Sequence, residues 1–207
     1  MVARRLFDLV LSLSALVALA VPMILVAAAV RMTSGSPVFF HQIRIGRHGR
    51  PFRLHKFRTM RLSSGGPQVT ASDDERVTTV GTFLRRWRID ELPQLWNVLK
   101  GEMSIIGPRP EVERFVRHYT PEQRRLLEQR PGLAGMAQLV YADEAEILKG
   151  CDDPERTYVM DLLPRKLAID LEYERRRTFG SDLVLLGRLV LVAARLAPTA
   201  GEKDVKR

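Results

Sequence analysis

An apolar stretch near the N-terminus places the strongest constraint on how this chain can fold. From Leu9 to Val30 the residues are almost continuously apolar, interrupted only by two serines and Pro22. At a rise of about 1.5 Å per residue, a helix of this length crosses roughly 30 Å of hydrocarbon. The sequence therefore predicts a membrane-inserted segment, and three forms of it compete: a cleaved signal peptide, a spanning helix, and a helix that enters the bilayer and returns.

The charges on either side of this segment favour the returning form. Arg4 and Arg5 precede it, and many basic residues follow from Arg31 onward. Because positive residues prefer the cytoplasmic side, a straight spanning helix would place one flank on the wrong side. Pro22 removes a backbone hydrogen bond and bends the helix, which lets the chain dip in and come back. A kinked spanning helix stays open as an alternative, whereas Asp8 and the length of the stretch argue against a signal peptide.

The net charge of the chain points to an anionic partner. The 207 residues carry a formal net charge of +9, which favours nucleic acid, phospholipid or a phosphorylated small molecule. The single cysteine, Cys151, excludes an internal disulfide. The four histidines form no ligand-like pair, which argues against a histidine-based metal site.

Periodicity predicts an α+β domain after the membrane segment. Runs 38–45 and 52–57 flank a turn rich in glycine and proline and indicate a β-hairpin. A loop is expected at 62–68, and short helices or irregular structure at 141–161. The remaining expected elements are helices at 80–87, 92–100, 121–129, 162–177 and 183–196, and a buried strand at 103–106. The last helix is too short and too charged to span, so we expect it to lie at the bilayer interface or to pack on the domain.

Two adjacent carboxylates at the start of the central helix are the candidate reactive groups. Asp90 and Glu91 follow an arginine cluster, and Pro93 suits the first turn of the helix. The amides and the macrodipole of a helix N-terminus favour negative charge and keep such carboxylates ionised. They can then bind a metal or attack an electrophile, although helix capping alone also explains the pair. Further along, Pro108 and Pro110 hold Arg109 extended, so its guanidinium can be fixed for a phosphate or carboxylate.

Four motifs follow one another along the chain: Lys56–Met60, Asp90–Gly101, Gly107–Glu111 and Arg130–Gly132. Together and in this order they resemble those of the bacterial sugar transferase family, the monotopic phosphoglycosyl transferases that start polysaccharide or glycoprotein glycan assembly. The resemblance runs from the membrane segment to about Leu186. It implies a small enzyme that is a minimal catalytic unit, without the extra spanning helices of the larger members.

The resemblance implies a specific reaction. Members transfer a sugar phosphate from a nucleotide diphosphate sugar, commonly a UDP-sugar, to a polyprenyl phosphate such as undecaprenyl phosphate. Asp90 would attack the sugar-linked phosphorus to give a phosphosugar-aspartyl intermediate, and the polyprenyl phosphate would then attack that intermediate. Glu91, with Asp90 beside it, would hold Mg²⁺.

The family motifs also assign substrate-binding residues. Arg85 is expected near the polyprenyl phosphate and Arg109 near the nucleotide diphosphate. The full set of expected substrate-binding residues is Lys56, Arg58, Arg85, Arg88, Arg109 and Arg130. Ala134 and Met136 stand where the family often has threonine and tryptophan, which leaves the identity of the sugar open.

The implied organisation is a re-entrant helix at 1–34, a catalytic domain at 35–197 and a polar tail at 198–207. The domain, with its β-hairpin, short strands and amphipathic interface-lying helices, would face the cytoplasm on the bacterial inner membrane. Nucleotide sugar, polyprenyl phosphate and phospholipid are the expected partners, nucleic acid is not, and a homodimer is compatible. Two alternatives are a membrane-tethered nucleic-acid-binding or adaptor protein, and an inactive scaffold, against which the intact Asp90–Glu91 pair argues.

Overall fold

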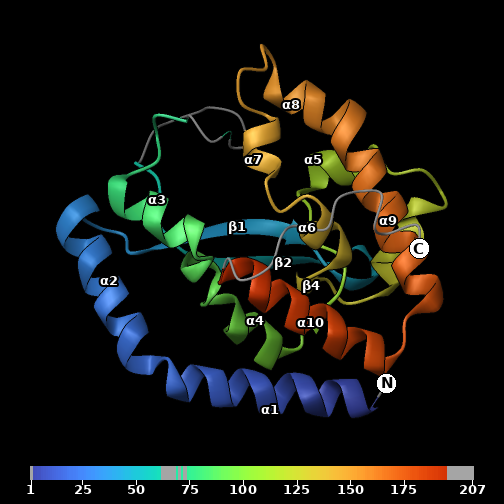
Figure 1. The fold of residues 1–207 in the computed structure, drawn as a ribbon, viewed down its shortest axis with the longest axis horizontal. Helices are drawn as coiled ribbons and strands as arrows, with labels where there is room; N and C mark the ends of the chain where they lie inside the picture. The colour runs from blue at the N-terminus through green and yellow to red at the C-terminus, as the bar shows by residue number, and fades with distance from the viewer. Residues whose placement is uncertain (1, 62–68, 70, 72–73, 195–207) are drawn as a thin grey trace.

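The computed structural model of the chain describes residues 2–61, 69, 71 and 74–194, and it is a mixed fold of helices and two small sheets (Figure 1). The α-helices are α1 Val2–Ala18, α2 Ala20–Ser34, α3 Thr79–Arg86, α4 Gln94–Lys100, α5 Glu113–Val116, α6 Met136–Val140, α7 Glu144–Ile147, α8 Pro154–Thr157, α9 Leu163–Arg176 and α10 Phe179–Ala193. The 3-10 helices are η1 Arg47–Gly49, η2 Ile89–Glu91 and η3 Gln123–Glu128, and η4 Tyr158–Leu162 is a π-helix. The strands are β1 Phe39–Ile45, β2 Pro51–Phe57, β3 Ser104–Ile106 and β4 Gly132–Ala134.

The apolar N-terminal stretch forms two helices, α1 and α2, which meet at an angle of 62°. Pro22 lies in the first turn of α2, has no N–H to donate to the carbonyl of Ala18, and crowds that carbonyl with its ring. The helix is therefore interrupted at Leu19, between the two. Within the described residues, no single helix is long and apolar enough to cross a bilayer. Taken together, the two bent helices have the length and apolar composition that a bilayer requires, either as a broken span or as a re-entrant loop.

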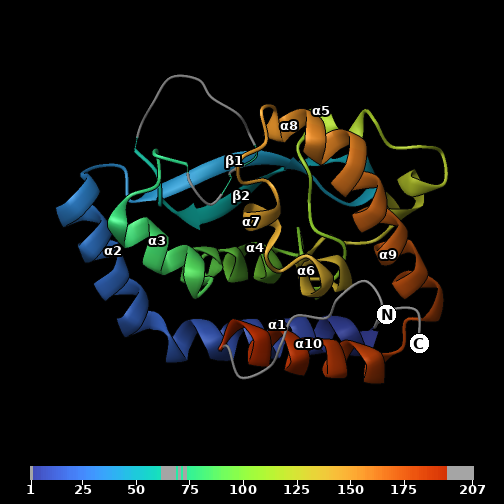
Figure 2. The ribbon, with the colours of Figure 1, turned by 45° about the horizontal axis from the view of Figure 1, so that its top comes forward.

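Helices α1 and α10 lie side by side in one layer below the rest of the domain (Figure 2). The rings of Phe7 and Phe179 meet edge to face at 5.6 Å, and Arg4 Nε lies 2.9 Å from Asp182 Oδ2. The inward faces of both helices join a core cluster that contains Leu95, Ile105 and Leu185. Apolar side chains on the outward faces stay exposed, among them Leu6, Val10, Leu13, Val184, Val190 and Leu191.

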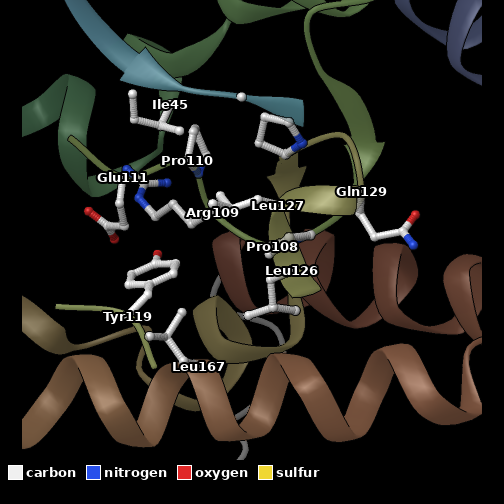
Figure 3. A pocket seen from close by; sticks show the side chains of 12 residues that line it. Ile45, Pro108, Arg109, Pro110, Glu111, Tyr119, Leu126, Leu127, Gln129 and Leu167 are labelled. Atoms are coloured by element: carbon white, nitrogen blue, oxygen red, sulfur yellow. The ribbon is translucent and has the colours of Figure 1, made fainter. Parts of the chain in front are cut away.

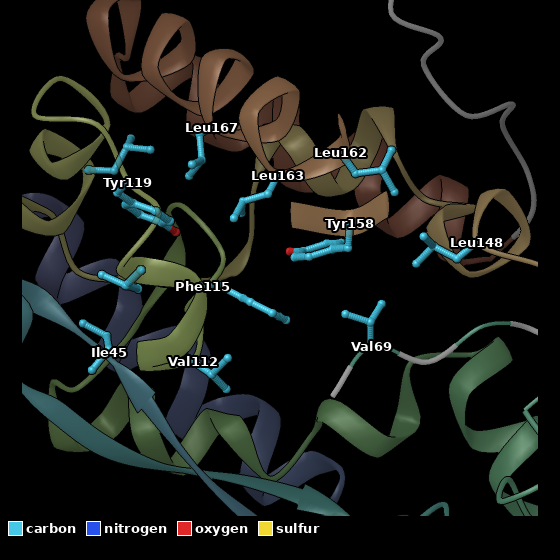
Figure 4. Close-up of a cluster of buried hydrophobic side chains, with 12 residues drawn as sticks. Ile45, Val69, Val112, Phe115, Tyr119, Leu148, Tyr158, Leu162, Leu163 and Leu167 are labelled. Carbon is cyan, nitrogen blue, oxygen red and sulfur yellow. The ribbon is translucent and has the colours of Figure 1, made fainter. Parts of the chain in front are cut away.

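Two further clusters complete the core. One lies between α5, η3, η4 and α9 and includes Phe115, Tyr158 and Leu163 (Figure 4). The other joins α2, β2 and α3 through Val30, Phe57 and Leu84. The α2 helix is thereby packed against the hairpin and α3, so the N-terminal pair is part of the domain and not a detached anchor.

The expected hairpin is confirmed, with β1 and β2 antiparallel and Phe40 opposite Lys56. Helices near the expected positions of α3, α4, α9 and α10 are also present, and the buried strand is β3. The expected helix at 121–129 is a shorter 3-10 helix, η3. The sequence did not predict α5 and α6, because their four and five residues are too few for a periodic signal. The loop expected at 62–68 and the tail at 198–207 lie outside the described residues.

The parallel pairing of β3 with β4 was not expected from the sequence. Ser104 lies opposite Gly132, and Ile106 opposite Ala134. Gly107 N donates to Ala134 O at 2.9 Å, and Gly132 N donates to Pro108 O at 2.8 Å. The segment that carries Arg109 is therefore fixed to β4 on both sides of Pro108.

Asp170 of α9 makes the stability of this fold depend on pH. Its buried carboxylate accepts a hydrogen bond from Ala137 N at 3.0 Å, at the start of α6. Burial raises the pKa of Asp170 to about 7, and neither that hydrogen bond nor the nearby charge of Lys166 offsets it. Because the pKa is higher in the folded state, Asp170 contributes stability below pH 4 that is lost as the pH rises through 7.

Asp170→Asn should therefore stabilise the protein more at pH 8 than at pH 5, by about 2 kcal/mol. The amide oxygen still accepts from Ala137 N, and no charge forms when the pH rises. Thermal or denaturant unfolding of the detergent-solubilised protein at both pH values measures the difference. Asp161→Asn, the same change at an exposed position on η4, is the matched control and should respond equally at both pH values. An equal response of Asp170→Asn would contradict the burial argument.

Candidate active site

Asp90 and Glu91 lie in the short 3-10 helix η2 that connects α3 to α4. Arg88 precedes it in the left-handed conformation, with φ 53° and ψ 22°, which costs a non-glycine residue about 1 kcal/mol and is common at functional sites. Pro93 occupies the N-cap position of α4, so both carboxylates lie immediately before that helix. Their expected place near a helix N-terminus is confirmed, and both side chains are buried.

Glu91 is held by cations from two other segments. Lys56 Nζ donates to Glu91 Oε1 at 2.9 Å, and Arg109 Nη2 donates to the same oxygen at 2.8 Å. Arg88 Nη1 lies 3.9 Å from Glu91 Oε2. Burial opposes ionisation of Glu91, but the charges of Arg109, Lys56 and Arg88 outweigh it and hold its pKa well below the usual value. Glu91 is therefore a fixed carboxylate at the junction of β2, η2 and the Arg109 segment.

Asp90 differs from its neighbour because no described residue donates a hydrogen bond to its carboxylate. Burial raises the pKa of Asp90, and the charge of Glu91 adds to that effect. Lys56, Arg85 and Arg109 act in the opposite direction. A carboxylate that is surrounded by positive charge without being bound by it keeps its oxygens available for reaction.

Lys56 is positioned by the packing of β2 against α4. Asn97, fully buried in α4, accepts a hydrogen bond from His55 N at 3.2 Å and donates to Arg53 O at 2.8 Å. Its amide also donates to Glu102 Oε2 at 2.7 Å. Asn97 thus pairs with the backbone of β2 next to Lys56. Sequence analysis did not single it out, although an asparagine between Leu95 and Val98 on the apolar face of a helix was an available signal.

Arg109 is positioned by a buried polar group on its C-terminal side. Arg44 Nη1 donates to Pro110 O at 3.0 Å and to Glu111 Oε2 at 3.2 Å, and Tyr158 OH donates to Glu111 Oε1 at 2.5 Å. Figure 3 shows Arg109 and Glu111 beside a narrow pocket that Tyr119 also lines. With a volume of about 20 Å³, the pocket has room for a water molecule rather than a nucleotide. A substrate would therefore meet Arg109 from outside this pocket.

The remaining expected basic residues fall into two groups. Arg85 Nε donates to Thr59 Oγ1 at 2.9 Å, and its charge acts on Asp90, so it belongs to the site together with Arg88. Arg58 and Arg130 are not brought to the carboxylates. Arg58 is buried and donates to the carbonyls of Ser34, Gly35 and Ser36, where α2 ends.

Arg130 donates from Nε to Gly101 O at 3.0 Å, at the opposite end of α4 from Glu91. The last carbonyls of a helix have no intrahelical partner, and guanidinium groups can satisfy them. The buried Arg58 satisfies three carbonyls at the end of α2, whereas the half-buried Arg130 satisfies one at the end of α4. Both arginines therefore have structural hydrogen bonds that the sequence motifs did not indicate.

The carboxylate oxygens of this site can coordinate Mg²⁺ only together with oxygens from the substrate. Among the described residues, no three histidine, cysteine, aspartate or glutamate side chains come together as a metal site. Glu91 Oε1 is taken by Lys56 and Arg109, which leaves Glu91 Oε2 and the Asp90 carboxylate. Mg²⁺ is commonly bound by one or two carboxylates together with substrate phosphates and water, and this pair matches that requirement.

Comparison with known proteins places the chain among sugar transferases. The family profile described as bacterial sugar transferase matches residues 1–195. An uncharacterized sugar transferase of Bacillus subtilis, EpsL, is 45% identical over 139 residues, which cover 67% of this chain and 69% of that protein. The UDP-glucose:undecaprenyl-phosphate glucose-1-phosphate transferase of Caulobacter vibrioides is 38% identical over 193 residues, 90% of this chain and 68% of that protein.

A third relative is named for a different sugar. The UDP-N-acetylgalactosamine-undecaprenyl-phosphate N-acetylgalactosaminephosphotransferase of Aeromonas hydrophila is 44% identical over 131 residues, or 60% of this chain. This chain covers only 30% of that protein's length. Relatives of comparable identity thus differ in the sugar that their names specify.

Proposed function

The chain belongs to the bacterial sugar transferase family and is a transferase, and from this we propose that it moves a sugar 1-phosphate from a UDP-sugar to undecaprenyl phosphate and releases UMP. Two of the relatives, those of Caulobacter vibrioides and Aeromonas hydrophila, are named for UDP-sugar donors and an undecaprenyl phosphate acceptor. The observation that carries the proposal is the contrast within the carboxylate pair. Glu91 is fixed by two cations, and beside it Asp90 is buried and accepts no hydrogen bond from any described residue.

In the first half of the proposed reaction, an Asp90 carboxylate oxygen forms a bond to the phosphorus that carries the sugar. The bond from that phosphorus to the bridging oxygen of the diphosphate breaks, and UMP leaves with the electron pair. The product is a phosphosugar-aspartyl intermediate. In the second half, an oxygen of undecaprenyl phosphate attacks the same phosphorus, the bond to Asp90 breaks, and the carboxylate is restored. Each half is an attack on phosphorus with a phosphate or a carboxylate as leaving group.

The basic residues stabilise the negative charge that gathers at this centre. Arg109 and Lys56, both bound to Glu91, are placed to act on the diphosphate of the donor, and fixed cations need little reorganisation during reaction. Arg85, on the α3 side of Asp90, is the candidate for the phosphate of the lipid acceptor. Mg²⁺ held by Glu91 and Asp90 would supply Lewis-acid neutralisation of the donor phosphates.

The acceptor places the reaction at a bilayer surface. We infer that the bent pair α1–α2 inserts from the cytoplasmic side of the inner membrane. The exposed apolar faces of α1 and α10 would lie against the lipid. Arg85 and Asp90 would then meet a lipid phosphate at the depth of the headgroups. The lipid-linked product suits the start of exopolysaccharide or another glycan.

UMP release by the detergent-solubilised protein tests the proposal. UDP-glucose, UDP-galactose and the two UDP-N-acetylhexosamines are offered with undecaprenyl phosphate and Mg²⁺. We expect sustained UMP release from at least one donor, dependent on both the lipid and Mg²⁺. Without the lipid, a route through an aspartyl intermediate releases about one UMP per enzyme and then stops. If folded protein in the presence of Mg²⁺ releases no UMP from any donor, the proposed function is wrong for UDP-sugars.

A further inference from the structure

We propose that Arg5 and Asp8 of α1 are positioning residues, which hold the two segments that carry the reactive groups at a fixed separation. This inference rests on the function proposed above, because it concerns the same site. It gives α1 a role in catalysis that is separate from its role in membrane binding.

Asp8 fixes β3 to α1. Asp8 is only 4% exposed. Ile105 N donates to Asp8 Oδ1 at 2.9 Å, and Ser104 Oγ lies within hydrogen-bonding distance of both carboxylate oxygens, at 3.0 and 2.9 Å. The chain runs from β3 directly into Gly107 and Arg109, so Asp8 anchors the strand from which the Arg109 segment emerges.

Arg5 fixes α4 to the same turn of α1. Its Nη1 donates to Val98 O at 2.7 Å and its Nη2 donates to Leu99 O at 2.8 Å. These carbonyls belong to the last turn of α4, where positive charge is favoured, and Val98 O also accepts from Gly101 N at 3.0 Å. Asp90 and Glu91 immediately precede the other end of α4. The position of α4 relative to α1 therefore also sets the position of the carboxylate pair.

The two anchors converge because Arg5 and Asp8 are three residues apart and share one face of α1. One helical turn thus holds both α4 and β3. The ion pair between Arg109 and Glu91, at 2.8 Å, joins the segments that extend from these two elements. A misplacement of about 1 Å between reacting groups can cost on the order of a hundredfold in rate, so the relative position of α4 and β3 matters for turnover.

Bilayer insertion alone gives no reason for a carboxylate at position 8. A charged side chain in an inserted helix is costly, and such residues usually mark a specific partner. Replacing Asp8 by leucine makes α1 more apolar, so membrane binding should stay equal or improve. The same change removes every hydrogen bond that Asp8 makes to β3. Asp8→Leu therefore separates the positioning role from membrane binding.

The test uses the whole chain, with three measurements on each variant. Membrane binding is measured by co-sedimentation of detergent-purified protein with phospholipid vesicles. Hydrogen–deuterium exchange over 94–106, and steady-state kcat and KM for the donor that the wild type accepts, are measured in lipid nanodiscs. For Asp8→Leu we expect unchanged vesicle binding, faster exchange at 104–106 and a kcat lower by about tenfold or more, with KM changed less than about threefold. Asp8→Asn keeps an acceptor for Ile105 N and should recover part of kcat.

Ser12→Ala is the matched control on α1. Ser12 is fully buried, and its hydroxyl has no hydrogen-bond partner among the described residues. The substitution removes a polar atom from α1 without removing an anchor, so exchange and kcat should match the wild type. Ser104→Ala removes the hydroxyl partner of Asp8 from the β3 side, and provides a second variant if Asp8→Leu does not fold.

Two results would overturn the proposal: wild-type exchange and kcat in both Asp8→Leu and Ser104→Ala, or a loss of kcat that follows a loss of vesicle binding. Hydrogen–deuterium exchange can be measured on a protein that has no catalytic turnover. One outcome is that the wild type transfers no sugar phosphate while Asp8→Leu still speeds exchange at 104–106. In that case the proposed function is wrong, but Asp8 does hold β3 in place. Failure of the function and failure of the anchor are thus separable.

Discussion

Asp90→Asn is expected to lower lipid-dependent UMP release by at least about a thousandfold, because an amide oxygen cannot serve as the nucleophile toward phosphorus. Asparagine has nearly the same shape as aspartate, so Glu91, Lys56 and Arg109 should keep their contacts. The single UMP per enzyme that the wild type releases without lipid should also disappear. Steady-state and single-turnover assays of purified wild type and variant measure both effects.

The variant should fold at least as well as the wild type. Burial raises the pKa of Asp90, which means that the ionised side chain destabilises the folded protein, and a neutral amide removes that cost. An unfolding midpoint equal to or above that of the wild type would show that activity is lost because the nucleophile is missing and not because the protein unfolds. Asp161→Asn, at an exposed position outside the site, should be fully active. Undiminished turnover in Asp90→Asn would rule out this residue as the nucleophile and leave the family assignment intact.

Gly132→Ala is expected to destabilise the protein by about 3 kcal/mol or more. A Cβ at position 132 would lie 2.2 Å from Gly107 N, 2.4 Å from Gly107 O and 2.6 Å from Gly107 Cα. All three atoms belong to backbone, so no change of side-chain rotamer relieves the overlap. The β3–β4 pair must open, and with it the support of the Arg109 segment. Denaturant unfolding measures the loss, and UMP release should fall in parallel at temperatures where the variant remains folded.

Gly187→Ala is the matched control for this substitution. Gly187 lies in α10, and apart from its chain neighbours and the adjacent helix backbone, no atom lies within 4 Å of the position that its Cβ would take. Alanine has the higher helix propensity, so this variant should be neutral or more stable by up to about 1 kcal/mol. If Gly132→Ala proved as harmless as Gly187→Ala, β3 and β4 would not be packed as closely as the structure has them.

Local sequence patterns were sufficient to predict the helix and strands near the site. The hairpin follows from strand alternation around a glycine-rich turn, and α4 follows from Leu92, Leu95 and Leu99 with Pro93 at its start. The adjacency of Asp90 and Glu91 to a helix N-terminus follows as well, because it depends only on residues that are close in sequence. Elements of three to five residues, such as β4, α5 and α6, carried no comparable signal.

The roles of the arginines could not be read from local sequence. Arg58 and Arg109 both lie in motifs of the family, yet Arg109 binds Glu91 while Arg58 binds the carbonyls at the end of α2. An arginine can satisfy a carboxylate or a set of backbone carbonyls equally well, and the choice depends on which group lies within reach after folding. Spacing in a motif does not contain that information.

Reading the sequence was enough to identify the family, the elements around the site, the carboxylate pair and the proline that bends the apolar segment, because each depends on neighbouring residues or on an ordered set of motifs. The partners of the charged residues became evident only in the folded chain. Lys56 and Arg109 meet on one oxygen of Glu91, and Arg5 and Asp8 hold α4 and β3 from one turn of α1. The physical reason is that a hydrogen bond is made over about 3 Å in space and is independent of distance along the chain, so residues nearly a hundred positions apart become partners only when the core brings them together.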